Sequence, residues 1–74
     1  MLEKAQQCND EFLRSAANQV EEMQVLLDSN LITEVEFKDL LEDIKRTVEI
    51  EEQCSDMETK ADLIKAISII AKIV

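Results

Sequence analysis

The chain contains neither glycine nor proline in its 74 residues. Tight hairpin turns between strands need positive backbone φ angles, which glycine supplies, and proline begins many turns. A sheet protein without either residue is therefore disfavoured. The abundant Glu, Leu, Lys, Gln, Ala and Met favour helix instead. The sequence predicts an all-α fold.

The length of the chain limits how much surface it can bury. A domain of this size buries only about 60% of the surface that its unfolded form exposes. The sequence has no histidine and two cysteines, too few ligands for a structural zinc site. We expect one helical domain over residues 1–74, without metal or cofactor. A partner protein or self-association would add the missing stability.

Apolar residues recur every three or four positions in three stretches, which predicts helices at about 3–28, 34–53 and 56–74. These helices would form an antiparallel hairpin followed by a third helix, as in a three-helix bundle. Whether such bundles associate into oligomers is left open at this point.

Local signals mark the two boundaries between these helices. Asn30 tolerates the left-handed conformation that ends helices when glycine is missing. Thr33 and Glu36 form a capping box, in which the Thr side chain caps and the Glu side chain reaches back. A second capping box, Ser55 with Glu58, is expected to begin the third helix.

The two cysteines lie at equal distances from the expected turn, because Cys8 is 23 residues before Leu31 and Cys54 is 23 residues after it. Since both helices of a hairpin rise by about 1.5 Å per residue, the cysteines should approach one another at its open end. They can be a redox-sensitive pair that clamps the hairpin. The favoured alternative is that they are two small buried apolar residues, as cysteines often are, because disulfides are rare in the cytosol.

The third predicted helix is apolar around most of its circumference. From Leu63 onward its only polar residues are Lys65, Ser68 and Lys72. A helix that faces a core needs an apolar stripe only about 100° wide, so docking on the hairpin should leave apolar residues over. Ile69 and Ile73 are the residues that we expect to remain uncovered. The residues predicted to bind a partner are Ile64, Ile69, Ile73 and Val74.

Three interpretations of this surplus remain open. The groove between the other two helices can cover it, a homo-oligomer or partner protein can bind it, or it can anchor the chain to a membrane. Membrane anchoring is disfavoured, because the helix offers few cations and no interfacial aromatic residue. We expect a cytoplasmic protein, since the chain shows no signal peptide and no apolar run that could span a bilayer.

Charge excludes several classes of function. The net charge of −9 argues against direct binding to nucleic acid phosphates or to an anionic membrane. Without histidine, Cys–His or Ser–His catalysis is excluded, and a phosphate loop rich in glycine cannot exist. The many carboxylates are those of a solvated acidic surface, so we expect no enzyme.

One segment of the chain resembles two known patterns. Residues 31–37 look like the exit half of an EF-hand, in which Glu36 would be the bidentate calcium ligand. That resemblance puts Val25 and Leu27 at the first and third ligand positions, where calcium needs oxygen atoms. We therefore expect no calcium binding.

The second resemblance is to short helical hairpins near the C-terminal ends of some bacterial proteins (SHOCT-like), which read roughly Leu-Leu-x-x-Gly-x-Ile-Thr-x-x-Glu-Phe. Residues 26–37 are similar to this pattern, with Asn30 in place of glycine. The resemblance implies a hairpin that oligomerises or docks on another protein.

The functional hypothesis is a non-enzymatic protein–protein interaction module, acting as an adaptor, an assembly chaperone or a small inhibitor. It would bind through the apolar face of the C-terminal helix. The alternative is an acidic inhibitor that imitates nucleic acid, because residues 34–58 carry ten carboxylates whose spacing could imitate phosphates.

Overall fold

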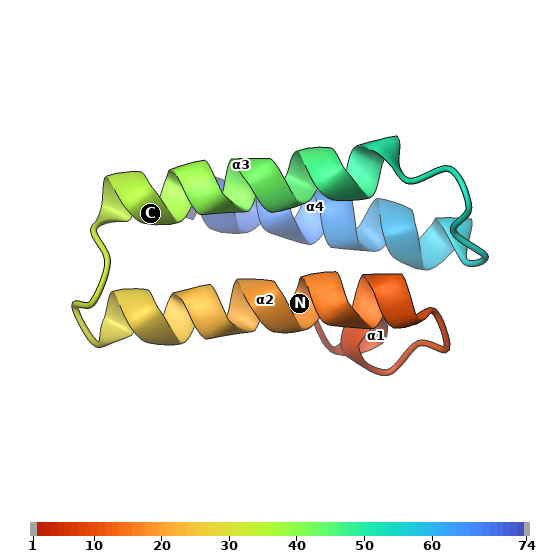
Figure 1. Cartoon of the computed structure of the whole chain (residues 1–74), viewed down its shortest axis with the longest axis horizontal. Coiled ribbons are helices and arrows are strands. Elements are labelled where there is room, and N and C mark those ends of the chain that lie inside the picture. Colours follow the sequence, from red (N-terminus) through yellow and green to blue (C-terminus); the bar gives the residue numbers. More distant parts are fainter. Residues whose placement is uncertain (1, 74) are drawn as a thin grey trace.

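The computed structural model describes residues 2–73, and this part of the chain contains helices and no strands, as the sequence predicts. The four helices are α1 (Glu3–Gln6), α2 (Glu11–Asp28), α3 (Glu34–Ile50) and α4 (Met57–Ile73). Successive long helices run in opposite directions (Figure 1). The α2–α3 turn and the end of α4 therefore lie at one end of the molecule. The α3–α4 loop and the start of α2 lie at the other.

The prediction of one continuous helix over residues 3–28 is wrong. The helix stops at Gln6, and α2 begins at Glu11 after a reversal that lays α1 against both α2 and α4. Asp10 is the reason, because its carboxylate accepts hydrogen bonds from the amides of Phe12, at 3.0 Å, and Leu13, at 3.3 Å. Short acidic side chains make such N-caps more readily than they continue a helix.

The turn between α2 and α3 matches its prediction. Asn30 has a φ angle of 60°, and the amides of Leu31 and Asn30 donate to the carbonyls of Leu26 and Leu27 at 2.9 and 3.0 Å. This pair of bonds is a Schellman motif, which satisfies the last carbonyls of a helix. The capping box at Thr33 is also confirmed, since both of its hydrogen bonds with Glu36 are present.

The boundary before α4 differs from its prediction. The preceding helix, α3, ends at Ile50 rather than at residue 53. Asp56, not Ser55, caps α4, because its carboxylate accepts bonds from the amide of Thr59 at 3.0 Å and from the Thr59 hydroxyl at 2.6 Å. The predicted capping box of Ser55 with Glu58 is therefore wrong. The backbone amide and the hydroxyl of Ser55 instead donate to the carboxylate of Asp10. Only tertiary folding brings these two residues together.

The core lies along the axis between the three long helices and is almost wholly aliphatic. Phe37 is its one fully buried aromatic residue within residues 2–73. The other large apolar side chains with under 2% exposure are Leu13, Val20, Leu41, Val48, Leu63 and Ile67, and the polar Thr59 is buried with them. Each long helix contributes to this set, so the packing of all three depends on the same apolar contacts.

Candidate protein interface

α4 lies between two grooves of different character. It shares one groove with α3, and it shares the other with α2. The small helix α1 fills the half of the α2–α4 groove nearest the start of α2 (Figure 1). The covering of α4 by its own chain is thus incomplete on one side.

α1 is held in its groove by apolar and ionic contacts. Leu2 and Ala5 are buried, and the Lys4 ammonium donates to Glu58 at 3.0 Å and to Asp62 at 2.8 Å. The carboxylate of Asp62, and then that of Glu58, raise the pKa of Lys4 above its usual range. Since all three side chains are about half exposed or more, solvent screens these ion pairs, and the apolar burial contributes most of the docking energy.

Beyond α1 no other part of residues 2–73 covers the same groove. A hollow of about 260 Å³ marks the place where α1 stops, and Gln24 and Ile70 line it from opposite helices. The next turns of these two helices carry Val25, Ile69 and Ile73, which are 59%, 38% and 75% exposed. We call the part of the α2–α4 groove lined by these three residues the open groove.

The structure does not gather the four predicted binding residues on one surface. Ile69 and Ile73 are exposed, as the sequence analysis expected, and they lie only about 40° apart around the helix. Ile64 is half-buried against the core and lies about 180° from Ile73, on the side facing α3. Val74 lies outside the described residues. A single partner helix can therefore contact Ile69 and Ile73 without touching Ile64.

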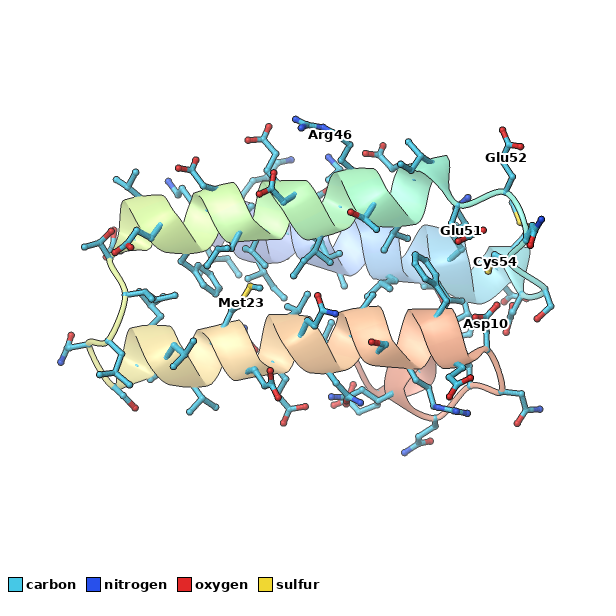
Figure 2. The ribbon with its side chains drawn as sticks, viewed as in Figure 1. Asp10, Met23, Arg46, Glu51, Glu52 and Cys54 are labelled. Atoms are coloured by element: carbon cyan, nitrogen blue, oxygen red, sulfur yellow. The ribbon has the colours of Figure 1, made fainter. Side chains whose placement is uncertain are left out.

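The two cysteines lie around Asp10, at the end of the bundle where α2 begins. Both are free thiols and half-buried. The Cys8 thiol donates to the carbonyl of Ala5 at 3.0 Å and lies 3.5 Å from the carbonyl of Asp10. The Cys54 thiol donates to the carbonyl of Asp56 at 3.5 Å, and Figure 2 shows Cys54 and Asp10 close together. The pairing of Cys8 with Cys54 as a disulfide stays a prediction.

Burial raises the pKa of the Cys54 thiol, because a thiolate loses hydration in that position. The amide of Ser55, followed by the thiol of Cys54, lowers the pKa of Asp10. Asp10 is therefore an anion near neutral pH, whereas Cys54 remains a thiol.

Two residues at this end were not singled out from the sequence. Lys60 is 9% exposed, and its ammonium donates to the carbonyl of Glu51 at 2.6 Å. No sequence pattern marks a lysine that binds the end of the preceding helix. Asp10 could have been found, because an Asp followed by Glu11 and then an apolar run is an N-cap pattern.

Within residues 2–73, no group of three His, Cys, Asp or Glu side chains is arranged to hold a metal ion. None of the helices in that range has the length and apolarity needed to cross a bilayer. Comparison of the chain with protein-family models, curated proteins and solved structures gives no significant match.

Proposed function

We propose that this chain is a non-enzymatic protein–protein interaction module, and that its partner inserts an amphipathic helix into the open groove. The observation that supports this most directly is α1. A helix of the chain's own already occupies the other half of the same groove, with Leu2 and Ala5 buried in it. A partner helix would extend that arrangement by one or two turns.

The residues of the open groove suit this mode of binding. Grooves bind amphipathic helices through apolar anchors spaced three or four residues apart. Ile69 and Ile73 are four residues apart on α4, and Val25 on α2 is 59% exposed. In an aqueous monomer these side chains remain hydrated, so their burial by a partner would contribute about 25 cal/mol for each Å² of apolar surface.

The open groove also accounts for the expectation of self-association. A second copy of the chain could cover the same residues. The protein would then be an oligomer without its partner, and the partner would replace the second copy on binding. An adaptor, an assembly chaperone or a small inhibitor in the cytoplasm are roles consistent with either occupant. The resemblance of residues 26–37 to short docking hairpins also supports a function in binding another protein.

Substitution of Ile69 and Ile73 by Asp tests the proposal. We expect the double variant to keep its helical spectrum and to lose both self-association, measured by sedimentation equilibrium, and capture of the protein partner. Val35→Asp is the matched control, because Val35 is 69% exposed on α3, outside the open groove. Unchanged mass and unchanged capture in the double variant would contradict the proposal, as would equal losses in the control.

The alternative function is imitation of nucleic acid by the acidic surface. It is supported by the exposure of Glu34, Asp39, Glu42 and Asp43 along α3. Salt separates the two functions. Affinity for a partner that normally binds nucleic acid would fall steeply between low and physiological ionic strength, whereas apolar docking in the open groove would change little.

A further inference from the structure

The groove between α3 and α4 has a different chemistry from the open groove. Its volume is about 310 Å³. Leu41 and Ile67, which are 0% and 1% exposed, form its floor. The other lining residues are Lys38, Glu42, Lys45, Ser68, Ala71 and Lys72. We call this site the lysine groove, because three lysines and one carboxylate line it.

This concentration of positive charge is unusual for the molecule. The sequence has 17 acidic and 8 basic residues. Three of the basic residues are engaged in the fold: Lys4 with Glu58 and Asp62, Arg14 with the carbonyl of Cys8, and Lys60 with the carbonyl of Glu51.

The three lysines of the groove are not engaged in this way. Within residues 2–73, Lys38, Lys45 and Lys72 make no hydrogen bond and no ion pair. The two remaining basic residues, Arg46 and Lys65, do not line the groove, and Figure 2 shows Arg46 pointing away from the other helices. The unpaired positive charge of an acidic protein is thus concentrated beside an apolar floor.

From this complementarity we infer that the lysine groove binds an acidic amphipathic helix of another protein. Aliphatic side chains of that helix would cover Leu41, Ile67 and Ala71. Asp or Glu residues at its edges would pair with the lysines. The acidic remainder of the molecule repels such a helix, so the groove is where an acidic segment gains both apolar burial and charge pairing.

The spacing of the lysines fits a helix that lies along the groove. Lys38 and Lys45 are seven residues apart on α3, which is two helical turns, or about 10.5 Å. Carboxylates seven residues apart on a partner helix repeat at the same interval. Lys72 approaches from α4, on the other side of the floor. An acidic residue on each edge of the partner would meet a lysine.

The lysine groove is separate from the open groove, because Ile67 and Ile73 point to different sides of α4, about 120° apart. This inference does not rest on the proposed function. Its test can therefore fail while binding at the open groove succeeds, and the reverse.

Selection from a peptide library tests the inference. The library is a set of 16-residue helical peptides with Leu at fixed heptad positions and with flanking positions randomised among Glu, Gln and Lys. Peptides selected for binding to the full chain should be enriched in Glu. These peptides should bind the Lys38→Glu, Lys45→Glu variant at least tenfold more weakly than the parent chain. Selection on that variant should instead enrich Lys. Chemical shift changes should include Leu41, Ile67 and Ala71.

Lys65→Glu is the control, since it makes the same change of charge on an exposed position of α4 outside the groove. It should reduce affinity less than twofold. No enrichment of Glu, or equal losses in Lys65→Glu and the double variant, would overturn the inference. So would shift changes confined to Ile69 and Ile73, which would place the peptide in the open groove. Self-association abolished by Lys38→Glu, Lys45→Glu would show a second copy as the occupant and also overturn it.

Discussion

The carboxylate of Asp10 accepts a hydrogen bond from the backbone amide of Ser55 at 3.1 Å, although the two residues are 45 positions apart in the sequence. The same carboxylate caps α2 through the amides of Phe12 and Leu13. Asp10 therefore joins the start of α2 to the loop that precedes α4. It determines where the first helix ends and holds the loop on which Cys54 lies.

Replacement of Asp10 by Ala should lower the melting temperature by about 4 to 8 °C, because it removes an N-cap and the contact with Ser55 together. Thermal unfolding followed by circular dichroism measures the change. Asn9→Ala is the control, since Asn9 is exposed and next to Asp10. Equal melting temperatures for the two variants would show that the Asp10 contacts contribute little.

Acid should destabilise the fold through two aspartates. The amide of Ser55 lowers the pKa of Asp10, and the hydroxyl of Thr59 lowers the pKa of Asp56. The unfolded chain therefore binds protons more readily than the folded one. The stability that these carboxylates add is present above the unfolded pKa of about 3.9 and is lost as pH falls through their lower folded values.

Urea titrations between pH 2 and pH 6, a range chosen around the ordinary Asp pKa of about 3.9, measure this loss. The Asp10→Asn, Asp56→Asn double variant should show a shallower decline of stability with acid than the parent chain. An identical decline in both would assign the acid sensitivity to other carboxylates.

Lys60→Met should reduce the free energy of unfolding by about 1 to 3 kcal/mol, because the charged donor to the half-buried carbonyl of Glu51 is lost. The Met side chain keeps the apolar volume of the lysine stem. Urea denaturation measures the effect. Lys65→Met, on an exposed position of the same helix, should change it by about 0.5 kcal/mol or less. A neutral result for Lys60→Met would mean that water replaces the ammonium at Glu51.

Leu41→Ala should cost about 2 to 5 kcal/mol, because it leaves a cavity among side chains from α3 and α4. Domains of this size have little stability to lose, so we expect a measurable unfolded population without denaturant. Leu31→Ala is the control at a position that is 71% exposed in the α2–α3 turn. Similar losses in the two variants would contradict the position of the core.

The thiol of Cys54 should react slowly with iodoacetamide near neutral pH, because burial raises its pKa and thiolate is the reactive form. Mass spectrometry of digested samples measures the rate of alkylation, with urea-unfolded protein as the reference.

The predicted pairing of Cys8 with Cys54 is tested by the same digestion of protein that has been treated with oxidised glutathione. A linked peptide of Cys8 and Cys54 would support the pairing, and two separate glutathione adducts would contradict it.

Several features could be predicted because they depend on neighbours a few residues away. The left-handed Asn30 and the capping box of Thr33 with Glu36 involve bonds that span five residues or fewer. The exposure of Ile69 and Ile73 was also predictable, because the surplus of apolar residues on one helix is a matter of periodicity.

Other features could not be predicted, because they join residues far apart. The break after Gln6 lets Leu2 and Ala5 bury themselves against α2 and α4, a gain that the local pattern of residues 3–28 does not reveal. Helix periodicity puts Ile64 and Ile73 on opposite sides of α4, but which neighbouring helix covers each side depends on tertiary packing. The lysine groove brings together Lys45 and Lys72, which are 27 positions apart in the sequence.

The sequence by itself determined an all-helical chain, the turn at residues 28–33 and an excess of apolar surface on the last helix, because backbone propensity and periodicity are local properties. Only the tertiary structure decided where α1 lies, which helix packs on each side of α4 and where unpaired lysines gather. Those outcomes depend on the competition of distant segments for the same apolar surface, which no single segment encodes.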